Sequence, residues 1–169
     1  RGFWVGDRLV AIASEPSDGE SIETSIEDGT LRDDPDRAAE IARDLADALG
    51  YIHERGALHL GVAPQNVVIG EDGNALLLNM GVAELVEATL PDVQFRGMPG
   101  YTAPERFDPE DERIGPWTDL YALGAVLFRA ATGTEAFRGS TADEVIDGEL
   151  DGASVEPRAH NPKISPFLE

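Results

Sequence analysis

The side chains that could do chemistry gather in two short stretches of the sequence, residues 59–66 and 79–81. His59 lies in an apolar segment, where a buried histidine bonded to backbone is a better interpretation than a catalytic one. Asn66 and Asn79 are either turn residues, since each lies close to a proline or a glycine, or oxygen donors of a metal site. The sequence has no cysteine, which excludes thiolate catalysis, disulfides and cysteine-ligated metals.

A second group of candidate side chains lies between residues 89 and 119. Its acidic cluster consists of Asp108, Glu110, Asp111 and Glu112. Such a cluster could hold a cation, but a solvated run of charge is the better interpretation. The hydroxyls that could accept phosphate are those of Thr89, Tyr101, Thr102 and Thr118, and ordinary polar loop residues are the better interpretation of them. Asp119 heads an apolar helix, where the helix dipole favours an acid.

Two strong helix patterns must position these groups. The first follows Asp34, a good cap with a proline after it, and stops at Gly56. Its apolar face carries Ile41, Leu45, Leu49 and Ile52. The second, residues 118–132, is apolar nearly all round, which predicts burial on most faces. Thr118 is its expected cap and Gly133 its expected end.

The remaining pattern predicts short strands and small helices. Hairpins are expected at 3–14 and at 67–69 with 75–78, and short helices at 22–26 and 141–147. Residues 81–116 show little regular pattern beyond a turn of helix at 82–88. A loop of this length inside a compact domain is normally functional or mobile.

Four stretches, in order along the chain, resemble signature motifs of the protein kinase superfamily. Residues 59–66 (His-Leu-Gly-Val-Ala-Pro-Gln-Asn) look like the catalytic loop, 79–81 like the metal-binding motif, 97–105 like the end of the activation segment, and 119–124 like the start of the buried central helix. The resemblance implies an α+β fold, the mostly helical large lobe of a protein-kinase-like domain together with the last two strands of the small lobe and the hinge.

The resemblance also implies how the chain is divided. Residues 1–14 correspond to the end of the small lobe, 15–19 to the hinge and 20–169 to the large lobe, cut before its final helices. Glu15 and Ser17 would then belong to the hinge, whose backbone faces an adenine. No stretch resembles the glycine-rich phosphate loop, and no lysine precedes Lys163.

Departures from the family pattern concern the residues that transfer phosphate. Gly61 stands where the resemblance places the catalytic Asp, Leu60 replaces the Arg before it, and Ala63 replaces the catalytic-loop Lys. Asn79 replaces the metal-binding Asp, and Asn66 is kept. Phosphoryl transfer needs a carboxylate to accept the substrate proton and another to hold Mg²⁺. We therefore expect at most residual ATP binding, weak or no Mg²⁺ binding, and no intact catalytic site.

Two further residues are architectural under the same resemblance. Asp119 would accept backbone N–H groups of the 59–61 loop. Glu105 would pair with an Arg located beyond Glu169, and we expect it to be unpaired here. Met98 replaces a Thr that normally contacts catalytic residues.

The sequence is thus interpreted as a catalytically impaired, pseudokinase-like module that acts in regulation or partner binding. A first alternative is a divergent active serine/threonine kinase in which another acid substitutes for Gly61. A second is a structural interaction module that binds no nucleotide. We expect a protein partner if the chain is a pseudokinase-like module or a structural interaction module. The sequence does not identify this partner.

The charge of the chain bears on partners and habitat. There are 13 Lys and Arg against 33 Asp and Glu, for a net charge of −20, so nucleic acid and anionic membranes would be repelled. Twelve of the cations are Arg, and no apolar run approaches the ~20 residues that span a bilayer. We expect a soluble, salt-adapted protein of a high-salt cytoplasm. The alternative is an acidic protein of an arginine-rich mesophile.

Overall fold

The computed structural model describes residues 2–6, 9–13, 18–82, 98–107, 113–139, 141–151 and 156–168. The strands are β1 (Gly2–Gly6), β2 (Leu9–Ala13), β3 (Glu20–Ser21), β4 (Val67–Ile69) and β5 (Ala75–Leu77). The α-helices are α1 (Ile22–Glu27), α2 (Thr30–Asp33), α3 (Pro35–His53), α5 (Pro116–Thr132), α6 (Ala142–Leu150) and α7 (Pro157–His160), and the 3₁₀ helices are η1 (Pro64–Asn66) and η2 (Pro104–Arg106). Helices make up about half of the described residues and strands far fewer, which fits the expected α+β large lobe.

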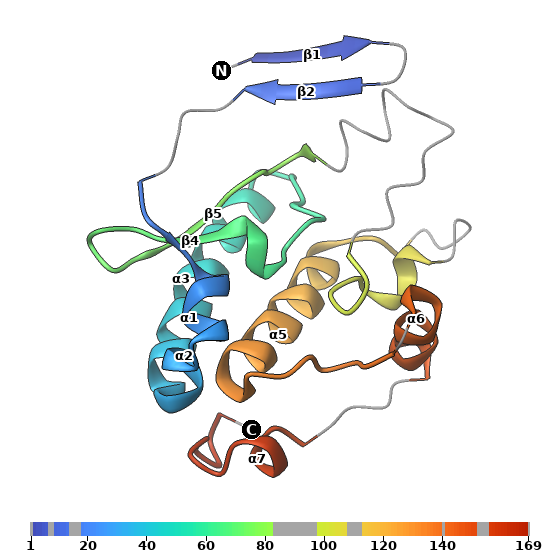
Figure 1. Ribbon diagram of the computed structural model, residues 1–169. Coiled ribbons are helices and arrows are strands. Elements are labelled where there is room, and N and C mark those ends of the chain that lie inside the picture. The colour runs from blue at the N-terminus through green and yellow to red at the C-terminus, as the bar shows by residue number, and fades with distance from the viewer. Residues whose placement is uncertain are drawn as a thin grey trace.

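β1 and β2 form the first expected hairpin. They pair antiparallel, with Gly2 opposite Ala13 and Gly6 opposite Leu9. In Figure 1 this hairpin lies apart from the helical part of the chain. Glu15 and Ser17, which the resemblance assigns to a hinge, follow this hairpin in sequence and lie outside the described residues.

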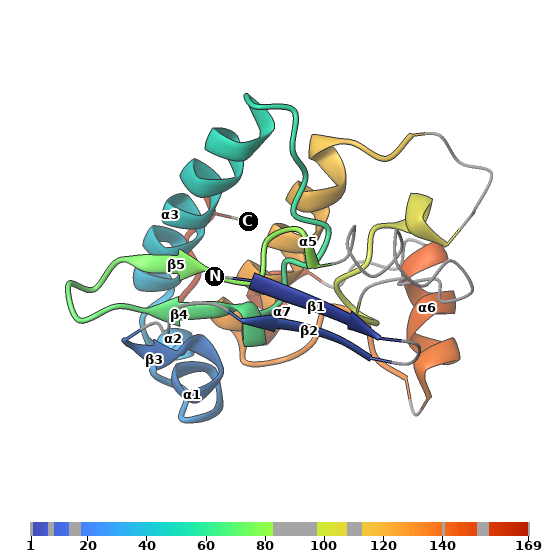
Figure 2. The ribbon, with the colours of Figure 1, turned by 90° about the horizontal axis from the view of Figure 1, so that it is seen from above.

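α3 is the long helix that the sequence predicts. The Asp34 side chain accepts the backbone N–H of Arg37 at 3.1 Å, and the proline that follows Asp34 occupies the first helical position. Ile41, Leu45 and Leu49 are buried along one face. This face packs against α5, and the two helices lie side by side in Figures 1 and 2. Together they supply most of the core.

A small antiparallel sheet connects the two stretches that carry candidate site residues. The strand order is β3-β4-β5, with Ser21 opposite Val68 and Val68 opposite Leu76. β3 has only two residues, too few for a sequence pattern, and was not expected. Asn66 immediately precedes β4, and the backbone N–H of Leu78, just after β5, donates to the Asn66 carbonyl at 2.8 Å. The hairpin therefore holds the 64–66 and 78–80 segments next to each other.

α5 departs from expectation at its beginning and on one face. It begins at Pro116 rather than at Thr118, whose hydroxyl instead accepts the Gly115 N–H at 3.1 Å. Trp117 and Leu120 are 57% and 51% exposed. The prediction that this helix is buried on most faces is therefore wrong for its first turns. Hydrophobicity alone does not say which neighbours cover a face. The helix ends at Gly133 in a left-handed conformation, as expected.

Smaller differences concern the ends of the chain and its middle. α6 begins and ends within a few residues of the expected 141–147, whereas the short α2 and α7 were not expected. Some predictions fall outside the described residues. They are Thr89, the acidic cluster at 108–112, and the helical turn at 82–88 except for its first residue. In the part of the chain that the structure describes, no helix has both the length and the apolar content needed to cross a bilayer.

Candidate functional site

His59 is a buried structural residue at the start of the 59–66 loop. It is 1% exposed, its Nδ1 accepts the N–H of Gly61 at 3.2 Å, and its Nε2 lies 3.0 Å from the carbonyl oxygen of Leu78. Burial lowers the pKa of the ring, although the bond to Leu78 and the nearby Asp119 act in the opposite direction. A neutral ring with its proton on Nε2 satisfies both contacts. The arrangement fits the backbone-bonded interpretation.

Asp119 ties the same loop to α5. Its Oδ2 accepts the N–H of His59 at 2.8 Å and its Oδ1 accepts the N–H of Leu60 at 2.7 Å. His53 Nε2 lies 2.8 Å from Oδ2, and the Asp119 side chain is 1% exposed. These are the backbone contacts that the kinase resemblance implies. They hold Leu60 in a left-handed conformation, φ 57°, which a branched side chain adopts only at a cost.

Gly61 offers no side chain at the centre of this loop. A Cβ atom at this position would find its nearest neighbour, Nδ1 of His59, at 3.7 Å, an ordinary van der Waals distance. A side chain would therefore fit at this position. The Gly61 carbonyl accepts Nδ2 of Asn66 at 2.7 Å, which keeps the loop closed without any carboxylate.

Asn66 and Asn79 form a hydrogen-bonded pair. Asn79 has φ 65° and donates its Nδ2 to Oδ1 of Asn66 at 2.8 Å. The amide nitrogen of Asn66 is already used by the Gly61 carbonyl, so both ends of the Asn66 amide have partners. Magnesium needs several oxygen ligands and favours carboxylates. The residues present do not fit that ion, because an N–H group occupies the Asn66 oxygen and neither side chain carries charge.

Acidic side chains are scarce among the described residues around the loop. The described ranges contain no group of three or more His, Asp or Glu side chains placed to hold a metal. A cavity of about 220 Å³ lies between residues 60–66, residues 98–103 and the first turns of α5. Asp119 is the only carboxylate among the described residues that line it. This lining therefore supplies no acid that could replace the missing carboxylate at Gly61.

Glu105 has a partner that the sequence did not suggest. Its Oε1 accepts the hydroxyl of Thr118 at 2.6 Å, and Thr118 in turn accepts the Gly115 N–H. The expectation that Glu105 is unpaired is therefore wrong, because the first turn of α5 brings a hydroxyl within reach. This contact fixes η2 against the start of α5.

Residues 98–103 contribute a second part of the cavity lining. Thr102 is buried and donates its hydroxyl to the Met98 carbonyl at 2.8 Å, so it is not an exposed acceptor for phosphate. Gln65 Nε2 lies 3.0 Å from the Met98 sulfur, which links this segment to the 59–66 loop. Ala63 lies in the same loop and is buried.

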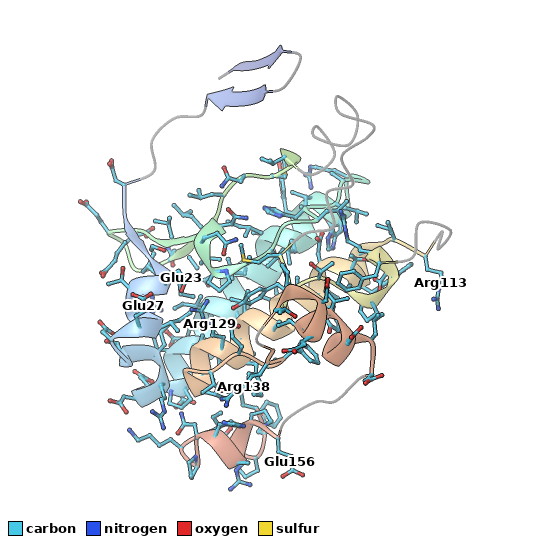
Figure 3. All side chains as sticks on the ribbon, turned by 45° about the vertical axis from the view of Figure 1, so that its right-hand side comes forward. Glu23, Glu27, Arg113, Arg129, Arg138 and Glu156 are labelled. Atoms are coloured by element: carbon cyan, nitrogen blue, oxygen red, sulfur yellow. The ribbon has the colours of Figure 1, made fainter. Side chains whose placement is uncertain are left out.

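An ion cluster centred on Arg129 was not found from the sequence. Arg129 on α5 contacts Glu23 of α1 at 2.9 Å and Glu135 at 3.0 Å, and it donates to the Tyr101 hydroxyl at 3.1 Å. Tyr101 donates to Glu135 at 2.6 Å. Figure 3 shows Arg129 and Glu23 meeting from neighbouring elements. The only sequence signal is that Arg129 is a charged residue near the end of a helix that is apolar nearly all round.

Burial raises the pKa of Tyr101 strongly, and the Glu135 carboxylate raises it further. The neutral hydroxyl is thus locked between a carboxylate and a guanidinium. Because Arg129 is bonded to α1 as well, the cluster joins the 98–103 segment, α1 and α5 into one unit.

These contacts define a helical lobe with two features. The 59–66 loop is held by the buried Asp119 of α5, and it lies next to the segment that leads into Ala-Pro-Glu. The protein kinase domain model matches residues 2–166, and the chain belongs to the protein kinase family. Serine/threonine-protein kinase 36 of Pongo abelii is 27% identical over 96% of this chain. Serine/threonine-protein kinase PknH of Mycobacterium bovis is 33% identical over 77%, and PkaA of Streptomyces coelicolor is 31% identical over 94%.

The chain corresponds to only a part of these relatives. It covers 12% of the length of the Pongo abelii protein, 22% of PknH and 29% of PkaA. All three carry the words serine/threonine-protein kinase in their names. The fold class and the superfamily expected from the sequence are confirmed.

Proposed function

We propose that this chain is the large lobe of a catalytically impaired kinase-like module that acts by binding and regulating a protein partner. The observation that carries the proposal is the pair of amides: Asn79 donates to Asn66 at 2.8 Å where the family pattern has a metal-binding carboxylate. Under the resemblance, a cation would lie between oxygen atoms of these two side chains. Here the Nδ2–H of Asn79 contacts the Asn66 oxygen directly. Catalysis of phosphoryl transfer rests almost entirely on positioning and charge, and both are reduced here.

The missing base supports the same proposal. Gly61 has no side chain to accept a proton, and Asp119 already accepts two backbone N–H groups and contacts His53. Both oxygens of this carboxylate therefore hold the loop and the His53 ring rather than facing a substrate hydroxyl unoccupied. The divergent-kinase alternative needs another acid within hydrogen-bond reach, and the described lining of the cavity offers none.

Nucleotide binding is a separate part of the proposal. Relatives named as protein kinases imply the use of ATP and Mg²⁺ in general. For this chain we propose at most residual ATP binding through the hinge at Glu15 and Ser17, which lie outside the described residues, with Asn66 and Asn79 contributing little. Because neither amide brings charge to a cation, Mg²⁺ should add little affinity.

A radiolabelled ATP assay on the full-length protein, with Mg²⁺ and Mn²⁺ in molar KCl, tests the proposal. We expect no turnover above background. Turnover that disappears in an Asn66→Ala variant would contradict impairment and favour the active serine/threonine kinase. The double variant Gly61→Asp with Asn79→Asp is the matched comparison, since it supplies both carboxylates and the Gly61 position has room for a side chain.

The active kinase remains a second candidate because one group of observations favours it. Asn66 and the 103–105 Ala-Pro-Glu segment are retained, and the loop is held by Asp119 as the family resemblance requires. Calorimetry with ATP, with and without Mg²⁺, separates the candidates. About a hundredfold gain in affinity from the metal would support the enzyme. No heat at all would support the structural module without nucleotide.

The partner and the habitat are also proposals. We propose a protein partner rather than nucleic acid or membrane, because the net charge of −20 repels anionic surfaces. The same charge supports a high-salt cytoplasm as the site of action.

A further inference from the structure

The cavity next to Gly61 is a candidate ligand site in its own right. Its volume is about 220 Å³, and its walls come from residues 60–66, residues 98–103, Arg106 and the first turns of α5. An apolar cavity of about 150 Å³ in another protein is large enough to bind benzene and stays dry when empty. This cavity has room for a one-ring or two-ring molecule.

Small side chains create the space. Gly61 and Ala63 stand where the family resemblance places an Asp and a Lys, and Ala103 and Ala122 also line the cavity. Ala63, Ala103 and Ala122 are buried. Gly61 and Ala63 therefore take up less of this space than the longer side chains that the resemblance implies.

Most of the polar groups on the cavity wall already have partners. Asp119 accepts two N–H groups, Thr118 is bonded to Glu105, and Thr102 is bonded to the Met98 carbonyl. The amide of Asn66 is bonded at both ends. A charged ligand would lose its hydration against a wall whose polar groups are mostly engaged, which is costly. These bonds favour an uncharged ligand.

Two residues on the wall favour an aromatic ligand over an aliphatic one. Met98 brings a polarizable sulfur, which interacts favourably with ring edges. Arg106 brings a guanidinium, which is attracted to the face of a ring. We propose that the cavity between the 60–66 loop, the 98–103 segment and α5 binds a small uncharged aromatic molecule of benzene to indole size.

Titration of the full-length protein with indole tests the site. We expect saturable binding in calorimetry and a melting temperature that rises with indole concentration, because a ligand that binds only the folded state stabilises it. Phenol should bind at least about threefold more tightly than cyclohexanol if the sulfur and the guanidinium favour a ring.

Variants locate the binding. Gly61→Val and Ala63→Leu each fill the cavity and should weaken indole binding at least about tenfold while maintaining or raising the melting temperature. The matched control is Gly124→Ala on α5, because a Cβ there meets no atom within 4 Å. It should bind indole as the parent protein does.

Three results would overturn the proposal: no saturable indole binding, unchanged binding in both folded filling variants, or equal affinity for phenol and cyclohexanol. If one filling variant fails to fold, the other decides. The site does not depend on the absence of phosphoryl transfer. A positive ATP assay would remove the proposed function and leave indole binding in place, whereas failed indole binding leaves the proposed function standing.

Discussion

The side-chain amide of Asn79 donates to Oδ1 of Asn66 across 2.8 Å, and it does so from a left-handed backbone with φ 65°. Asparagine tolerates this conformation better than most residues. The bond joins the end of β5 to the start of β4. Two positions that the kinase resemblance assigns to a metal site are therefore in direct contact here as neutral groups.

Replacing Asn79 with an aspartate should make the stability of the protein depend on Mg²⁺. In the Asn79→Asp variant the new carboxylate has no proton to donate to Asn66. We therefore expect a loss of about 1 kcal/mol in the free energy of unfolding and a melting temperature lower by about 2–4 °C. Millimolar MgCl₂ should recover most of this loss, because a carboxylate and an amide oxygen can share a cation. Calorimetric melting in EDTA and in MgCl₂ measures both effects.

The control at the same position is Asn79→Gly. It keeps the positive φ, removes the hydrogen bond and adds no charge, so it should lose stability without responding to Mg²⁺. A melting temperature of the parent protein that rises with Mg²⁺ as steeply as that of the Asn79→Asp variant would contradict the interpretation of the amide pair.

Replacing Asp119 with an asparagine should release the loop anchor. An amide has one acceptor oxygen for three donors, the N–H groups of His59 and Leu60 and the His53 ring. Leaving buried donors unsatisfied costs about 2–4 kcal/mol in the free energy of unfolding. Urea denaturation of the Asp119→Asn variant measures the loss. Asp47→Asn on the exposed face of α3 is the matched control and should change stability by less than about 0.5 kcal/mol.

The local signals in the sequence were sufficient for the elements that depend on short patterns. The cap at Asp34, the spacing of apolar residues along α3 and the turn between β4 and β5 each follow from neighbours in sequence. The role of Asp119 came from the kinase resemblance rather than from periodicity.

Features that depend on distant neighbours could not be predicted. The contact of Glu105 with Thr118 and the cluster of Arg129, Tyr101 and Glu135 join residues far apart in the chain. The two-residue β3 exists only because β4 lies beside it. The cavity next to Gly61 could not be predicted either, because the sequence does not show whether neighbouring side chains fill the space beside a glycine.

Tyr101→Phe should remove part of the alkaline sensitivity of the fold. The folded-state pKa of Tyr101 is raised above its ordinary value of about 10, so its contribution to stability is present below that pH and is lost as the pH rises through and beyond it. Above pH ~10 the unfolded chain gives up this proton and the folded chain keeps it. The parent protein should therefore lose stability more steeply than the variant.

Urea denaturation between neutral pH and pH ~11 compares the two slopes. At neutral pH the variant should be less stable by about 1 kcal/mol, because Glu135 and Arg129 lose a shared partner but keep each other. The matched control is Tyr51→Phe, since Tyr51 is exposed on α3. Equal alkaline slopes for the parent and for Tyr101→Phe would rule out this role of the hydroxyl.

Potassium chloride should stabilise the fold. The net charge of −20 produces self-repulsion in the compact state, and salt screens it over about 10 Å at 0.1 M and about 3 Å at 1 M. Salt also weakens favourable surface pairs. In the described part of the chain, such pairs include Arg37 with Glu40, Arg43 with Asp44, Arg55 with Glu54, and Lys163 with Asp33.

The screening of repulsion should outweigh the weakening of the ion pairs. Each exposed pair contributes only about 0–1 kcal/mol, and the acids outnumber the cations by 33 to 13. We expect the melting temperature to rise by many degrees between about 0.1 M and about 2 M KCl, with most of the rise below about 1 M, where screening saturates. A continued rise above that range would indicate cations bound to carboxylates. Melting in sucrose of equal osmolality is the control for excluded-solute effects. A melting temperature that does not change with KCl would remove both the salt-adaptation hypothesis and the expectation of a high-salt cytoplasm.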